Sequence, residues 1–195
     1  MSTYKNIDLM IDGSMVYCRP HRSESCSECN LELSPLNSLY KALSQVHGDI
    51  PPPNAINPNI ARQIMSLKEN GNKNLKEQNY EEAIKYYTYA IEFSFQRPIW
   101  EPHELTAQEV AYCLGKRSLA YLSINSLVNA YVDAEWGIRI KPDSVECYFR
   151  KGKALTKMKR YEEAVKAFEL GLEYVPNDED FKNALEEALK LVKND

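Results

Sequence analysis

The sequence predicts an all-α fold: a short solenoid of three stacked helical hairpins with a C-terminal capping helix, preceded by a small β-hairpin and Cys-His element. Two observations carry the solenoid: a Tyr-Glu-Glu-Ala motif occurs at both 80–83 and 161–164, and small residues recur at matching positions of three helical segments. A proline-rich stretch then separates these segments from a cysteine-rich region. The predicted organisation is an N-terminal element at 1–50, a linker at 51–59 and the solenoid at 60–195.

The repeat register follows from the two Tyr-Glu-Glu-Ala motifs. Repeat starts at Ile64, Ala111 and Val145 place a small residue at the eighth position of each unit, where two helices must approach closely. These residues are Gly71, Ser118 and Gly152, and the opposing twentieth positions are Ala83, Ala130 and Ala164. An unrelated helical bundle would share the apolar spacing, but it would not place small residues at the helix crossings of three units.

This pattern resembles the tetratricopeptide (TPR) repeat over roughly residues 60–177. The second and third repeat starts lie 34 residues apart, which is the TPR period, and Pro142 and Pro176 end these two units. The resemblance implies repeats at about 64–97, 111–144 and 145–177. The amphipathic segment 178–193 is then expected to cap the last repeat.

In a TPR solenoid, the first helices of the repeats line a concave groove that suits an extended peptide. TPR proteins that bind the C-terminal Glu-Glu-Val-Asp of cytosolic heat-shock chaperones hold its carboxylates with Lys, Asn and Arg side chains. By this resemblance the peptide-binding positions are Lys68, Asn72, Lys116, Glu146 and Arg150. Lys116 replaces the usual Asn, and Glu146 replaces the usual Lys. Glu146 is expected to repel the peptide unless Lys116 or Arg150 neutralises it; the alternative is that these charges only solvate the groove.

The N-terminal region contains a candidate metal site beside a predicted hairpin. Residues 6–12 and 14–17 flank Asp12-Gly13, a short turn signal. A Cys-x2-His pair and a Cys-x2-Cys pair follow, four residues apart, and they provide four ligands that suit tetrahedral zinc. The ligands would be Cys18, His21, Cys26 and Cys29. The alternatives are one structural zinc ion and a loop of free thiols. The remaining cysteines, Cys113 and Cys147, are predicted to be small buried apolar residues.

Thirteen additional residues separate repeats one and two, with Arg97-x-x-Trp100-Glu101 among them, and a helix is expected to begin near Thr106. This insertion, the segment Lys116-Arg117-Ser118, the Cys-His element and Leu36-Asn37-Ser38-Leu39 together resemble the small peripheral TPR subunit of the fungal post-translational Sec translocon. The resemblance implies a peripheral protein on the cytosolic face of the endoplasmic reticulum (ER). Its N-terminal part would bind a membrane-anchored sister subunit, and its groove would dock a chaperone C-terminus.

Composition excludes several other classes of function. A net charge of −4 disfavours general nucleic-acid binding and adsorption to anionic lipid. No apolar stretch is long enough to span a bilayer, and no signal peptide is apparent, which favours a cytoplasmic or nuclear location without direct membrane insertion. Neither a phosphate-binding loop nor a paired nucleophile and base is visible, so a non-enzymatic adaptor is expected. The alternative function is a soluble cytosolic TPR co-chaperone outside any membrane complex.

Overall fold

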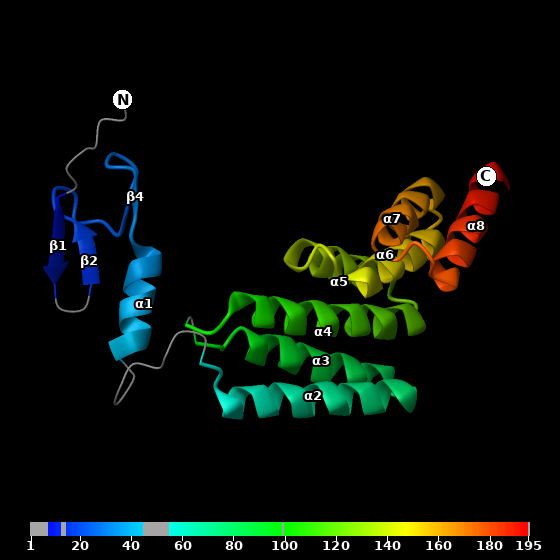
Figure 1. The fold of residues 1–195 in the computed structure, drawn as a ribbon, viewed down its shortest axis with the longest axis horizontal. Coiled ribbons are helices and arrows are strands. Elements are labelled where there is room, and N and C mark those ends of the chain that lie inside the picture. The colour runs from blue at the N-terminus through cyan, green and yellow to red at the C-terminus, as the bar shows by residue number, and fades with distance from the viewer. Residues whose placement is uncertain (1–7, 13–14, 45–54, 99, 195) are drawn as a thin grey trace. The chain divides into compact units, whose positions relative to one another are not determined.

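The computed structural model describes residues 8–12, 15–44, 55–98 and 100–194 (Figure 1). The chain divides into two compact units. Unit 1 is Met1–Ala55 with Pro98–Trp100, and unit 2 is Ile56–Arg97 with Glu101–Asp195. Part of the expected linker 51–59 lies outside the described residues, and its last two residues already belong to a helix.

Unit 1 begins with the predicted hairpin. Strands β1 (Leu9–Asp12) and β2 (Met15–Cys18) pair antiparallel, with Asp12 opposite Met15. The expected strand residues 6, 7 and 14 and the turn residue Gly13 lie outside the described part of the chain. Two short strands, β3 (Ser25–Cys26) and β4 (Leu31–Glu32), form a second antiparallel pair, and helix α1 (Ser34–Ser44) follows.

Asn37 attaches α1 to the hairpin. Its buried side chain accepts a hydrogen bond from the backbone N–H of Val16 at 2.7 Å and donates one to the Val16 carbonyl at 3.0 Å. An amide that pairs with both polar groups of one residue satisfies its own polar atoms while it fixes the approach of the helix. The Leu-Asn-x-Leu segment therefore has a structural role inside unit 1.

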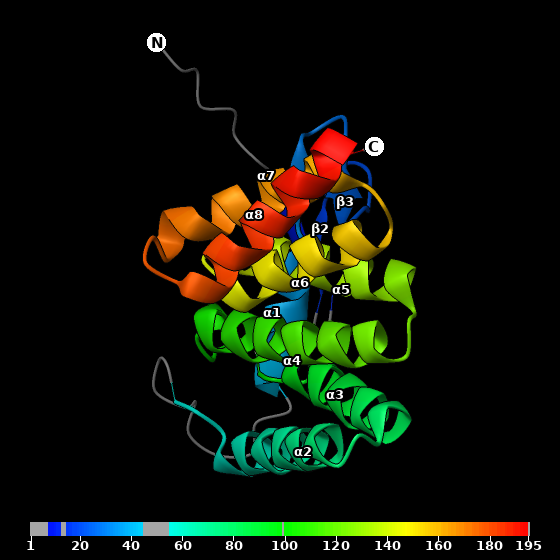
Figure 2. The same ribbon diagram turned by 90° about the vertical axis from the view of Figure 1, so that its right-hand side faces the viewer.

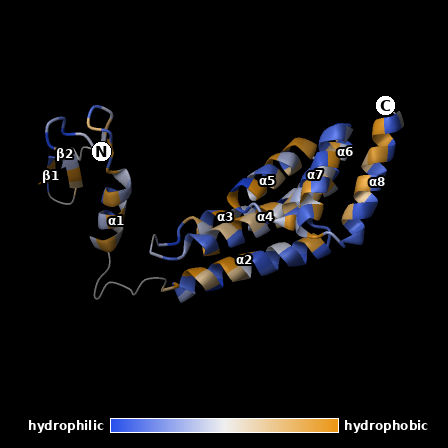
Figure 3. Ribbon diagram, turned by 45° about the horizontal axis from the view of Figure 1, so that its top comes forward, coloured by the Kyte–Doolittle hydropathy of each residue, from blue (hydrophilic) through white to orange (hydrophobic). Residues whose placement is uncertain are grey.

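Unit 2 consists of seven helices that stack in chain order (Figures 1 and 2). The three repeats are α2 (Pro58–Lys76) with α3 (Tyr80–Ser94), α4 (His103–Ser123) with α5 (Leu127–Ile140), and α6 (Val145–Lys157) with α7 (Tyr161–Tyr174). Helix α8 (Glu179–Asn194) packs on α7 as the predicted cap, and hydrophobic residues alternate with hydrophilic ones along it (Figure 3). The predicted all-α TPR solenoid is confirmed. None of the helices in the described ranges is long and apolar enough to cross a bilayer.

Helix starts follow local sequence signals. Asn57 caps α2, because its Oδ1 accepts from the backbone N–H groups of Asn59 and Ile60, and Pro58 occupies the first turn, where no N–H is needed. Helix α4 starts at His103, three residues before the expected position near Thr106. Pro102 occupies the N-cap position, where its missing N–H costs no helical hydrogen bond, and the charge of Glu104 in the first turn favours this helix end.

Small residues at the predicted positions set the spacing between helices. A Cβ added to Gly71 would lie 2.7 Å from the Tyr87 ring, and one added to Gly152 would lie 2.3 Å from the Phe168 ring. Ser118 donates to the carbonyl of Ala130 at 2.7 Å, which replaces an aromatic contact with a hydrogen bond in repeat two. In each repeat, a small residue on the first helix thus allows the second helix to pack closely against it.

The insertion is held by a buried ion-pair network. The Arg97 side chain is 2% exposed and pairs with Glu101 and, at 2.7 Å, with Glu109 on α4. Glu101 also accepts from the backbone N–H of Asn57 at 2.8 Å. A buried charge requires such partners, so Arg97 and Glu101 join the end of repeat one and the approach to repeat two to the start of α2.

Gly152→Ala is expected to lower the free energy of unfolding by about 1–3 kcal/mol, because the added methyl group overlaps the buried Phe168 ring. Urea unfolding followed by circular dichroism measures the change. In a Phe168→Leu background the additional cost of Gly152→Ala should shrink, since the overlapping ring is gone. Equal costs in both backgrounds would contradict this packing account.

Candidate functional site

The five predicted peptide-binding residues lie on the first helix of each repeat. Lys68 and Asn72 are on α2, Lys116 is on α4, and Glu146 and Arg150 are on α6. Helix α4 contacts both α2 and α6, so the three helices that carry these residues lie side by side along the predicted groove. All five residues are partly buried, which distinguishes them from freely solvated surface charges.

Tyr112 on α4 organises the α2 end of the groove, and sequence reasoning missed it. The Lys68 Nζ lies 4.5 Å from the centroid of its ring, and the Lys116 Nζ lies 5.7 Å from it. Its hydroxyl donates to Asn72 Oδ1 at 3.0 Å, and the Tyr87 hydroxyl donates to the same oxygen at 2.8 Å. The available signal was an aromatic residue four positions before Lys116, which places both on one helix face.

These contacts leave the donors at the α2 end of the groove available. Because Asn72 Oδ1 accepts two hydroxyl hydrogen bonds, the amide is oriented and its NH2 group remains for a ligand. Within the described ranges neither this NH2 group nor the Lys68 ammonium has a hydrogen-bonding or ion-pair partner. One cation and one amide donor are therefore positioned to receive a carboxylate.

Glu146 has the opposite situation, because both of its carboxylate oxygens are engaged. Lys116 donates to Oε2 at 3.1 Å, and the Nε of Arg150 donates to Oε1 at 3.0 Å. Burial alone would raise the pKa of Glu146, but Arg150 and Lys116 hold that pKa below its usual value. The neutralisation that the sequence required of Lys116 or Arg150 is provided by both.

Two hollows flank Glu146. One, of about 280 Å³, is bounded by residues of α4 and by the approach to α6, including Tyr112, Lys116 and Glu146. The other, of about 350 Å³, lies between α6 and the start of α8 and includes Phe149, Arg150 and Glu146. Glu146 thus lines both hollows and lies at the boundary between them.

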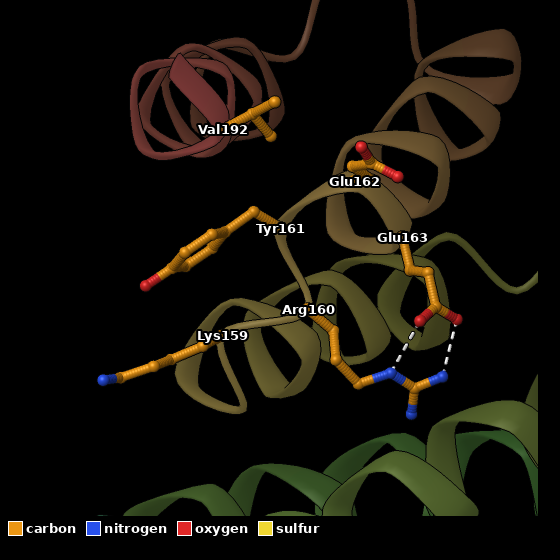
Figure 4. A pocket seen from close by; sticks show the side chains of 6 residues that line it. All are labelled: Lys159, Arg160, Tyr161, Glu162, Glu163 and Val192. Carbon is orange, nitrogen blue, oxygen red and sulfur yellow. Dashed lines mark hydrogen bonds and ion pairs between the residues drawn. The ribbon is translucent and has the colours of Figure 1, made fainter. Parts of the chain in front are cut away.

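A separate hollow of about 370 Å³ lies between the start of α7 and the end of α8 (Figure 4). Arg160 and Glu163 form an ion pair there at 2.6 Å, and Val192 reaches in from α8. Because these charges satisfy each other and none of the predicted peptide-binding residues lines the hollow, it does not belong to the groove.

The four candidate metal ligands converge in unit 1. The Nδ1 of His21 lies 3.4 Å from the Sγ of Cys18, 3.3 Å from that of Cys26 and 3.4 Å from that of Cys29. All four ligand atoms lie within 4.8 Å of one another. Zinc bonds of about 2.0–2.3 Å in a tetrahedron separate ligand atoms by roughly 3.3–3.8 Å, so the group could hold one metal ion.

Glu28 supports this cluster, and sequence reasoning missed it as well. Its Oε2 lies 2.9 Å from His21 Nε2, the ring nitrogen that faces away from the sulfur atoms. A carboxylate on the outer nitrogen of a histidine directs the inner nitrogen toward a metal. The available signal was its place inside the Cys-x2-Cys loop.

Cys113 and Cys147 are fully buried, as predicted. Burial raises the pKa of Cys113 to about 12 and that of Cys147 to about 11. Both thiols therefore stay protonated near neutral pH and act as small core residues.

Comparison with known proteins identifies the family. The tetratricopeptide repeat profile matches residues 145–178. The chain is 36% identical over 126 residues to the ER protein translocation subcomplex subunit sec67 of Schizosaccharomyces pombe, an alignment that covers 63% of this chain and 66% of that protein. The chain belongs to the family of this translocation subunit. It spans only about a fifth of the longer relatives that it also matches.

Two solved structures are similar in fold. A chain of the Sec complex from S. cerevisiae superimposes with a TM-score of 0.67 at 22% identity, covering 96% of this chain and 98% of that one. The first TPR domain of Spaghetti (RPAP3), described as bound to the HSP90 peptide SRMEEVD, superimposes with a TM-score of 0.58 at 26% identity and covers 68% of this chain and 97% of that domain. The second likeness is to a TPR domain with a peptide in place.

Proposed function

We propose that the chain is a non-enzymatic adaptor on the cytosolic face of the ER, within the complex that translocates finished polypeptides. Its groove docks the C-terminal Glu-Glu-Val-Asp tail of cytosolic heat-shock chaperones. The observation that carries the docking function is the pair of available donors at Tyr112, namely the Lys68 ammonium and the Asn72 NH2 group. The translocation subunit among its relatives supports the location.

The chemistry of the groove suits a chain end. A carboxylate needs a cation and neutral N–H donors that converge on it, and Lys68 and Asn72 provide these from adjacent turns of α2. Partial burial beside an aromatic ring strengthens the attraction relative to water. The similar RPAP3 domain with its HSP90 peptide supports the same use of the groove.

Lys68→Ala is expected to weaken binding of a peptide ending in Glu-Glu-Val-Asp by about 2 kcal/mol, because one charge-assisted hydrogen bond is lost. Isothermal titration calorimetry measures the affinity. Lys166→Ala on α7 is the matched control, since Lys166 is exposed and lies on a helix that does not line the groove. The docking function is wrong if the wild-type chain produces no binding heat, or if both variants bind equally well.

Unit 1 is the proposed attachment site for a membrane-anchored sister subunit. It exposes large apolar side chains on two elements, Ile11 on β1 at 75% and Leu36 and Tyr40 on α1. Contact with a partner would remove these apolar side chains from water. The competing proposal, a soluble co-chaperone, has no use for such a surface.

Affinity purification of the tagged full-length chain from detergent-solubilised native membranes tests the attachment. We expect integral subunits of the translocation complex to co-purify, and Ile11→Asp with Tyr40→Asp to reduce their recovery, because charges would be placed on an apolar interface. Lys68→Ala, which changes only the groove, should leave their recovery unchanged. Recovery of soluble chaperones alone would favour the co-chaperone function.

One structural zinc ion is proposed for the site formed by Cys18, His21, Cys26 and Cys29. Three sulfur ligands and one imidazole nitrogen within 4.8 Å of one another match the preference of zinc, and the Glu28 contact to His21 supports this assignment further. Four protein ligands leave no coordination position for a substrate, so the ion would stabilise the fold of unit 1 and have no catalytic role. It would join the end of β2, the end of β3 and the two turns that carry His21 and Cys29.

Elemental analysis of the purified protein is expected to find about one zinc per chain, and Cys26→Ser should abolish it. Glu28→Gln should weaken zinc affinity by about 10–100-fold, measured by competition with a chromogenic chelator, because His21 loses its orienting partner. Glu24→Gln serves as the control, since Glu24 is not among the cluster residues. A metal-free wild-type protein that keeps its fold would support the free-thiol loop instead.

A further inference from the structure

We infer that Glu146 determines which carboxylates of a bound tail the groove reads, an inference that rests on the proposed docking function. Glu146 already occupies Lys116 and Arg150, the cations on α4 and α6. The groove is then selective for the chain-end carboxylate, which Lys68 and Asn72 receive, and it is tolerant of neutral residues in place of the acidic side chains of the tail.

The position of Glu146 is built into the fold. Its stem lies against Gly115 on α4, where an added Cβ would come 3.1 Å from Glu146 Cγ. Its partners are well covered, with side-chain exposures of 24% for Lys116 and 17% for Arg150, against 37% for Glu146 itself. A side chain supported on three sides keeps its place better than an exposed ion pair.

A second carboxylate at this position would meet Glu146 as well as the two cations, so Glu146 would offset part of their attraction. Glu146 remains ionised because Arg150 and Lys116 lower its pKa against the effect of burial. An acidic side chain of the ligand would have to share these cations with Glu146, and two carboxylates that share one site repel each other. The acidic side chains of a tail therefore gain little from α4 and α6.

The α2 end of the groove differs in this respect. Among the described residues, no carboxylate pairs with Lys68, and the two tyrosine hydroxyls orient Asn72 with its donors outward. One cation and one amide suffice for one carboxylate, and the main-chain terminus provides one in every tail. The asymmetry between the two ends gives the selectivity its physical basis.

Calorimetry with three eight-residue peptides tests this inference. They end in Glu-Glu-Val-Asp, in Gln-Gln-Val-Asn with a free carboxylate, and in Glu-Glu-Val-Asp with an amidated terminus. The wild-type chain should bind the first two within about threefold and the amide at least about tenfold more weakly. Glu146→Gln, which releases two cations, should bind Glu-Glu-Val-Asp about tenfold more tightly than wild type and prefer it over Gln-Gln-Val-Asn by about tenfold.

Glu135→Gln is the matched control. Glu135 also bridges two cations, Arg139 at 3.1 Å and Lys151 at 2.7 Å, but it lies on α5, which does not carry the groove residues. Its loss should leave all peptide preferences unchanged. Thermal melting by circular dichroism confirms that each variant is folded.

The outcomes separate this inference from the docking function. If the wild-type chain prefers Glu-Glu-Val-Asp over Gln-Gln-Val-Asn by tenfold or more, or if Glu146→Gln keeps the wild-type preference, the role of Glu146 is overturned while docking stands. If neither protein binds any peptide, the docking function falls, and this inference falls with it.

Discussion

The close approach of paired helices at small residues is the constraint on which the rest of the structure depends. Gly71 and Gly152 leave room for the rings of Tyr87 and Phe168, so the two helices of a repeat meet at a fixed distance. That distance sets where the next repeat can pack, and it brings α2, α4 and α6 together along one groove. Tyr87 connects this packing to the groove directly. Its ring packs against Gly71, and its hydroxyl donates a hydrogen bond to Asn72 Oδ1.

The groove itself is organised by an aromatic ring as much as by charge. Tyr112 contacts Lys68 through its face and Asn72 through its hydroxyl, which couples two residues of the first repeat to the second. Glu146 connects the second repeat to the third through Lys116 and Arg150. Each link between repeats therefore also shapes the surface that a peptide would meet.

Much of this arrangement could be predicted from the sequence, because small residues at fixed intervals and the spacing of cysteines are local signals. The repeats, the cap, the hairpin and the convergence of Cys18 with His21 follow from them. The roles of Tyr112 and Glu28 could not be predicted in this way, because each depends on a contact whose geometry only the fold supplies. The start of α4 at His103 depended on how Pro102 is placed, which spacing alone does not determine.

The network around Arg97 limits which sequence changes this fold can tolerate during evolution. Its guanidinium is enclosed by Glu101 and Glu109, and Glu101 in turn receives the backbone of Asn57. A deletion that shortened the connection would separate these charges, and replacement of Arg97 would leave the buried Glu101 carboxylate without its cation. Homologous chains should therefore inherit the three side chains and the loop length as one unit, or discard them all together.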